Sequence, residues 1–173
     1  LNTHIANLGK EPAAPGRNTA IVVGAGLTGI EAACELPAKF ATAGITDCRV
    51  ILIDQNPHIG SDMGEEARGP IMEALTSLGI ETRTSVSVTA VDAEGITLAD
   101  GERIPSATIV WTAGVQASPL TSLLPVARDT LGRVSVDPFM RVAGIDNVLA
   151  AGDIASAMMD ETHPSVMSCQ HGR

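Results

Sequence analysis

Three glycines in residues 19–31 separate a short β-branched run from an alanine-rich helical pattern. Their spacing, Gly24-x-Gly26-x-x-Gly29, is typical of a strand, a tight phosphate-binding turn and a helix N-terminus. Gly24 allows the chain to turn sharply, Gly26 lets a pyrophosphate approach the backbone, and Gly29 lets the helix pack closely on the sheet. Free N–H groups at the start of that helix then face the phosphates. The pattern predicts dinucleotide binding, and a merely structural turn is the alternative.

An acidic residue ends the next apolar run of the chain. Residues 49–53 are Arg-Val-Ile-Leu-Ile, which is typical of a parallel strand buried on both faces, and Asp54 follows them. A carboxylate at this position accepts hydrogen bonds from the adenosine ribose hydroxyls. Gln55, Asn56 and Pro57 supply no arginine for a 2′-phosphate. We therefore predict NAD(H) rather than NADP(H); the alternative is an aspartate that only begins the turn before Pro57.

Composition limits the classes of protein to consider. The 173 residues are 45% hydrophobic and 18% charged, which indicates a globular chain rather than a disordered one. A formal net charge of −9 argues against nucleic acid or an anionic membrane surface as the main partner. The three cysteines lie far apart without metal-ligand spacing, and no run resembles a signal peptide or a membrane span. These features favour a reducing, cytoplasmic compartment.

The order of apolar patterns predicts an α/β fold. We expect a Rossmann-type parallel sheet with helices and a three-stranded antiparallel β-meander crossover. The expected helices cover 28–43, 60–78 and 154–162, with Pro37 kinking or ending the first. The expected strands are 47–54, a strand starting at 80, the meander within 85–104, 107–112, 134–136 and 147–151. The expected domains are a linker at 1–17, an NAD(H)-binding domain at 18–133, and a return segment at 134–173.

A second motif lies in residues 137–155, where an apolar run ends in Gly-Asp. With the glycine turn and the run Ile-Val-Trp-Thr-Ala-Gly at 109–114, it resembles the pyridine nucleotide-disulfide oxidoreductase family, which is built from two dinucleotide-binding domains. The resemblance implies that Asp153 binds the ribityl chain of FAD, that Glu31 lies near the nicotinamide, and that Gly114 lies under the bound NAD. Glu31 could alternatively be an acid that only stabilises the helix dipole.

Within this family the chain is most similar to type II NADH dehydrogenases, over residues 18–173. That resemblance implies hydride transfer from NADH to flavin and then to a quinone or another acceptor. The segment after Pro164 has Gln170 where the family has a glutamine, but Val166 stands where another is expected, which leaves a different acceptor open. The alternative function is a non-catalytic NADH-binding regulatory module. A dehydrogenase acting directly on a small molecule is disfavoured because no suitable catalytic set is present.

The first and last residues, Leu1 and Arg173, suggest a piece of a longer protein. We expect FAD and carboxy-terminal domains outside these residues, and leave open a homodimer and a peripheral place of the intact protein on the inner face of the membrane. His163 as a proton carrier and Cys169 as a nucleophile are disfavoured, so no catalytic side chain and no metal ligand are predicted. The expected cofactor-binding residues are Gly24, Gly26, Leu27, Thr28, Gly29, Glu31, Asp54, Gln55, Ala113, Gly114, Gly152 and Asp153.

Overall fold

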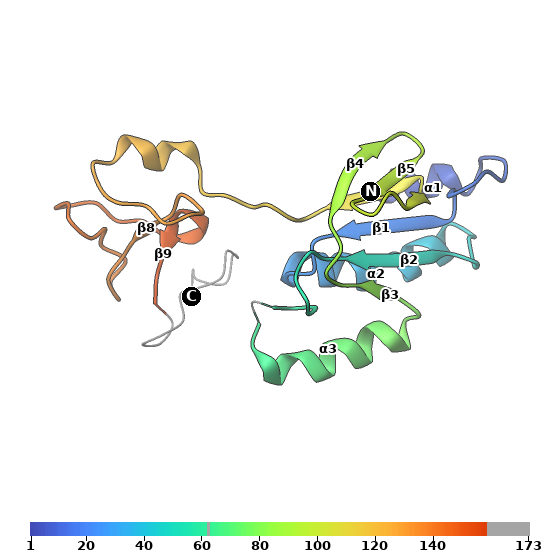
Figure 1. Ribbon diagram of the computed structural model, residues 1–173, viewed down its shortest axis with the longest axis horizontal. Helices are drawn as coiled ribbons and strands as arrows, with labels where there is room; N and C mark the ends of the chain where they lie inside the picture. Colours follow the sequence, from blue (N-terminus) through green and yellow to red (C-terminus); the bar gives the residue numbers. More distant parts are fainter. Residues whose placement is uncertain (62, 159–173) are drawn as a thin grey trace. The chain divides into compact units, whose positions relative to one another are not determined.

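Four strands of the first 113 residues form a parallel sheet (Figure 1). They are β1 (Thr19–Val23), β2 (Arg49–Ile53), β3 (Glu81–Arg83) and β7 (Thr108–Trp111), in the order β3-β2-β1-β7. Val23 is in register with both Ile53 and Trp111, so β1, β2 and β7 end at the same level. The strand order reverses beside β1, and ligands of such sheets bind at the carboxyl ends of the strands next to that point. The expected fold class is confirmed.

The computed structural model describes residues 1–61 and 63–158. Contacts divide the chain into two compact units, of which the first is Leu1–Ala113 and the second begins at Gly114. This division differs from the expected one after residue 133. The difference arises because β7 is the last element of the parallel sheet, and the segment that follows it packs with the second unit.

Three helices pack in the apolar layer on one face of the parallel sheet. They are α1 (Asn2–Leu8), α2 (Leu27–Thr42) and α3 (Glu65–Ser77). Phe40 and Leu36 of α2 and Leu75 of α3 are fully buried in one cluster with alternate side chains of β1 and β2. Burial of such large apolar side chains contributes roughly 1.5–3 kcal/mol each, which holds α2 against the strand that precedes it.

A three-stranded antiparallel sheet packs on the opposite face. Its strands are β4 (Val88–Asp92), β5 (Gly95–Leu98) and β6 (Arg103–Pro105), as the turn signals around residues 93–95 and 100–101 predict. Ile96, Leu98 and Ile104 form a buried cluster with the other set of side chains from β1 and β2. Both faces of the parallel strands are therefore covered, which explains their continuous apolar runs.

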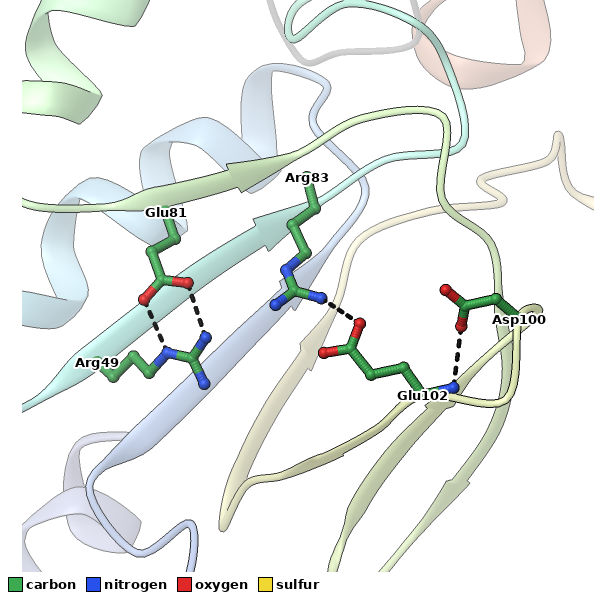
Figure 2. Close-up of polar contacts among 5 residues, drawn as sticks. All are labelled: Arg49, Glu81, Arg83, Asp100 and Glu102. Carbon is green, nitrogen blue, oxygen red and sulfur yellow. Dashed lines mark hydrogen bonds and ion pairs between the residues drawn. The ribbon is translucent and has the colours of Figure 1, made fainter.

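Two ion pairs tie β3 to its neighbours (Figure 2). Arg49 of β2 donates two hydrogen bonds to Glu81 of β3, at 2.7 and 2.8 Å, and these bonds lower the pKa of the Glu81 carboxyl. At the other end of β3, Arg83 pairs with Glu102 of the turn between β5 and β6, at 2.7 Å. Both pairs are partly exposed, so each contributes at most about 1 kcal/mol. They link the short strand β3 to β2 and to the antiparallel sheet.

Two expectations for the helices of the first unit differ from the structure. A helix, α1, forms within residues 1–17, where a linker was expected, because Ile5 and Leu8 are buried in the core beside α2. The expected early end at Pro37 is wrong, since α2 continues to Thr42. The lost backbone hydrogen bond at Pro37 is offset by the burial of Leu36 and Phe40 on the sheet.

The second unit contains little regular structure among its described residues. It has two 3₁₀ turns, Pro119–Leu123 and Gly152–Ile154, and a small parallel pair of β8 (Val134–Ser135) and β9 (Ala155–Ser156). The strand expected at 147–151 is wrong, because only Leu149 makes an isolated bridge there. The expected return to the parallel sheet is also wrong, since β8 and β9 form a separate sheet.

The helix expected from Ile154 is wrong as far as residue 158. Ala155 and Ser156 form β9 instead, because Ala155 is buried in a small apolar cluster with Val134 and Val142. The remainder of that expected helix, 159–162, lies outside the described residues.

Candidate functional site

The glycine turn begins where β1 ends, as its spacing predicts. Gly24 has φ +102° and donates from its nitrogen to Ile53 O at 2.8 Å. A Cβ on Gly24 would lie 2.8 Å from the Ala113 nitrogen, and a Cβ on Gly29 would overlap the Gly24 carbonyl oxygen. Both positions therefore need glycine for the packing of the protein itself.

Gly26 differs from the other two glycines. It is the N-cap of α2 with φ −74° and ψ −178°, a conformation that any residue adopts, and a Cβ there would meet nothing within 4 Å. No side chain caps this end of α2, so the N–H groups of its first turn keep their hydrogen-bonding capacity. Leu27 is half-buried and Thr28 is exposed in that turn. The arrangement leaves open space in front of a helix N-terminus, and proteins commonly bind anions at such places.

Asp54 lies at the carboxyl end of β2, beside the glycine turn. Its Oδ2 accepts from the Ala25 nitrogen at 2.5 Å, and its Oδ1 accepts from the Asn56 nitrogen at 2.7 Å. The second bond is the turn-forming contact of the alternative interpretation, so Asp54 does begin the turn before Pro57. A carboxylate has about four acceptor sites, so two remain for ribose hydroxyls. Gln55, which follows, is exposed.

Arg83 lies beside Asp54 in the fold, although residues 55–57 contain no arginine. The Asp54 nitrogen donates to Arg83 O at 2.9 Å, which places the ends of β2 and β3 side by side. The guanidinium of Arg83 is turned to Glu102, which itself is held by Asp100 (Figure 2). Arg83 is therefore already paired with a carboxylate. Only the parallel pairing of β2 and β3 reveals this neighbour.

The end of β7 completes the site on the other side of the turn. Ala113 is half-buried. Its nitrogen lies so close to Gly24 that a Cβ atom on Gly24 would be 2.8 Å from it. Thr112 donates from its nitrogen to Val23 O at 2.8 Å, and its Oγ1 lies 3.0 Å from the carbonyl oxygens of both Val23 and Gly24. The sequence analysis did not single out Thr112. The available signal is a hydroxyl at the end of an otherwise apolar strand.

The remaining expected residues belong to α2 or to the second unit. Glu31 is exposed in the second turn of α2, so it is not the first-turn acid of the alternative interpretation. Gly114 follows Ala113 directly, is exposed and has φ +76°, but belongs to the second unit. Gly152, with φ +72°, and Asp153 also lie there; Asp153 is exposed in a 3₁₀ turn rather than at a strand end.

The described residues were searched for metal-binding groups and for membrane-spanning helices. Within 1–61 and 63–158, no three His, Cys, Asp or Glu side chains are placed to hold a metal ion. No helix in this described part is long and apolar enough to cross a bilayer. The expectations for His163, Val166, Cys169 and Gln170 concern residues outside the described part.

Comparison with known proteins assigns the family of this arrangement. The family model described as pyridine nucleotide-disulphide oxidoreductase matches residues 3–172. The chain belongs to this family. The expected resemblance is thereby confirmed over nearly the whole sequence.

Relatives within the pyridine nucleotide-disulphide oxidoreductases are much longer than this chain. It is 55% identical over 177 residues to "NADH dehydrogenase-like protein Rv1812c" of Mycobacterium tuberculosis (strain ATCC 25618 / H37Rv), covering 100% of this chain and 44% of that protein. It is 38% identical over 155 residues to "Type II NADH:quinone oxidoreductase NdhA" of the same organism, covering 80% of this chain and 33% of that protein. The chain thus spans less than half the length of these curated relatives.

One solved structure shares the fold of this chain. The NAD-dependent persulfide reductase from A. fulgidus matches with a TM-score of 0.62 and 23% sequence identity, covering 87% of this chain and 27% of that one. At this identity the match supports the fold alone, with its parallel sheet and antiparallel crossover.

Proposed function

We propose that the first unit binds NADH at the glycine turn and that the intact protein is an FAD-dependent NADH oxidoreductase. The observation that carries the proposal is the open space at Gly26. Neither backbone conformation nor internal packing requires glycine there, whereas both neighbouring glycines of the motif are required by the protein itself. A ligand that must approach the backbone closely accounts for the glycine at position 26.

The residues around this space fit the parts of a dinucleotide. The N–H groups at the start of α2 bind the pyrophosphate, and Asp54 accepts from the adenosine ribose. Glu31 and Gly114 lie toward the nicotinamide, as the family pattern implies. When bound, NADH supplies a hydride that the flavin accepts, and the chain orients the nucleotide without a protein general acid.

The acceptor and the larger architecture are also part of the proposal. One relative is named a type II NADH:quinone oxidoreductase, which supports a quinone as the acceptor here. Residues 134–173 lead toward an FAD-binding domain outside this chain, with Gly152 and Asp153 touching the ribityl part of FAD. The intact protein is proposed to act at the inner face of the membrane as a peripheral protein.

The choice of nucleotide tests the proposed role of Asp54. We expect NADH to bind at least about tenfold more tightly than NADPH, equivalent to 1.4 kcal/mol, because the carboxylate repels a 2′-phosphate. Asp54→Asn should reduce this preference by about tenfold. Asparagine suits the test better than alanine, since its single amide oxygen can still accept from the Ala25 nitrogen, although the bond from the Asn56 nitrogen is lost. Isothermal titration calorimetry with both nucleotides measures the ratio.

A matched control is available at the opposite end of β2. Asp47 is hydrogen-bonded to Asn18 at 2.7 Å near the start of the sheet, away from the carboxyl ends of the strands. Asp47→Asn should leave both affinities unchanged. Equal affinities of NADH and NADPH for the unaltered chain would refute the assignment of Asp54.

Flavin retention separates the oxidoreductase from a protein that only senses NADH. The chain alone should be colourless, because Asp153 supplies one charged hydrogen bond, about 1.5–3 kcal/mol, against about 8 kcal/mol for micromolar binding. The intact protein should be yellow, and Asp153→Asn in it should weaken flavin binding by at least about tenfold. Absorbance of the purified proteins measures the bound flavin. Asp146→Asn, at another exposed aspartate of the same unit, should retain it.

Stoichiometric flavin on the 173-residue chain would show that its flavin site is larger than proposed. A colourless intact protein that still binds NADH would favour the regulatory module instead.

A further inference from the structure

The hydroxyl of Thr112 lies between two strands at the point where the sheet order reverses. Its Oγ1 is 3.0 Å from Val23 O and 3.0 Å from Gly24 O, so its single proton is shared between the last carbonyl of β1 and the first carbonyl of the turn. A Cβ atom on Gly24 would lie 2.9 Å from the same oxygen, and a Cβ atom on Gly29 would lie 2.8 Å from it. Thr112 thus contacts the glycine turn and the start of α2 at once.

The Gly24 carbonyl oxygen accepts its hydrogen bond from this hydroxyl. Gly24 is buried, and Gly29 of α2 packs directly against its carbonyl oxygen. Among the described residues, Thr112 is the one donor with a hydrogen bond to that oxygen. The Val23 carbonyl differs, because it also accepts from the Thr112 nitrogen. Removing the hydroxyl therefore leaves the turn's own carbonyl unsatisfied in a closed space.

Other hydrogen bonds hold the next peptide group of the turn from the opposite side. The Ala25 nitrogen donates to Asp54, and the Ala25 carbonyl accepts from the Gly60 nitrogen at 2.9 Å. The Gly24 nitrogen is bound to Ile53. Thr112 supplies the contact from the β7 side that completes this set. The turn is therefore held in shape by the protein without help from a ligand.

We propose that Thr112 is a positioning residue for the nucleotide: its hydroxyl holds the glycine turn in the conformation that receives the pyrophosphate. This inference rests on the proposed binding of NADH at the turn. A turn that is already ordered loses little conformational freedom on binding, which strengthens the affinity for the group that it contacts. The effect of Thr112 should thus be confined to ligands that carry a pyrophosphate.

The experiment compares Thr112→Val with Thr112→Ser in the 173-residue chain. Valine keeps the shape and removes the hydroxyl, while serine keeps the hydroxyl. Thr112→Val should weaken NADH and ADP by about tenfold and leave adenosine, which has no phosphate, within about twofold. Thr112→Ser should bind all three like the unaltered chain. Calorimetry serves for NADH and ADP, and ligand-observed NMR for adenosine.

A second measurement reports on the conformational stability of the glycine turn in the absence of ligand. Amide hydrogen exchange at Ala25 and Gly26 should be faster in Thr112→Val than in Thr112→Ser. Thr108→Val is the matched control, because Thr108 lies at the other end of the same strand, where its hydroxyl contacts His4 at 3.1 Å. It should change neither nucleotide affinity nor exchange at the turn.

The outcomes distinguish this inference from the proposed function. Failure of the unaltered chain to bind NADH or ADP would overturn the proposed function. Normal binding by the unaltered chain together with equally tight binding by Thr112→Val would overturn the positioning role alone. An equal loss for adenosine would also overturn it, because the residue would then act on the fold as a whole.

Discussion

Gly26→Val should abolish NADH binding while the protein stays folded. The backbone at Gly26 suits any residue, and a Cβ there points into open space, so the protein itself tolerates the side chain. The branched side chain would occupy the place of the pyrophosphate in front of α2. We expect at least about a hundredfold loss of affinity, equivalent to 2.7 kcal/mol. The free energy of unfolding should change by less than about 1 kcal/mol, since valine is only a poorer N-cap than glycine.

Calorimetry and urea unfolding together measure this prediction. Gly26→Ala provides a graded control, because its single methyl group should weaken NADH less than valine does and affect unfolding no more. If Gly26→Val still bound NADH with unaltered affinity, the open space at the turn would not be the pyrophosphate site, and the glycine turn would be structural only.

Gly29→Ala should lower the free energy of unfolding by about 3 kcal/mol or more. Gly26→Val, in contrast, should lower the affinity for NADH and leave stability nearly unchanged. A Cβ atom on Gly29 would overlap the Gly24 carbonyl oxygen and approach the Thr112 hydroxyl, both of which are fixed by the sheet. The start of α2 must therefore move away from β1, and overpacking of this kind typically costs 1–3 kcal/mol when flexible atoms can yield. Here the overlapped atom belongs to the backbone, so we expect the upper end or beyond.

Urea unfolding monitored by circular dichroism measures the stability of Gly29→Ala. The matched comparison is Gly26→Ala, the same substitution three residues earlier in the chain. The first variant should be destabilised and the second should be stable but weakened in binding. Similar stability of the two variants would contradict the close packing of α2 on the turn.

Features that depend on local pattern could be predicted from the amino-acid sequence. The glycine spacing, the apolar run before Asp54 and the turn signals around residues 93–95 each specify a backbone path within a few residues. The parallel sheet, the antiparallel crossover and the turn at Gly24 are accordingly present as expected. The family could also be predicted from the glycine turn and from residues 109–114 and 137–155, which keep the spacing of the family's motifs. The roles of the individual site residues stay predictions.

Features that depend on contacts between distant residues could not be predicted from local pattern. Helix α1 forms because Ile5 and Leu8 reach the core, and α2 passes Pro37 because Leu36 and Phe40 are buried on the sheet. In the second unit, the Gly-Asp segment forms a 3₁₀ turn and β9 rather than a strand and a helix.

The site shows the same division. Asp54 could be placed beside the turn from sequence, but its bond to Ala25 and the pairing of Arg83 with Glu102 could not. The hydroxyl of Thr112 meets the Gly24 carbonyl although 88 positions separate them in the chain. Local pattern specifies which backbone conformation a segment prefers. Which side chain satisfies a buried carbonyl is set by strand order and register, and these exist only once β1 and β7 lie side by side.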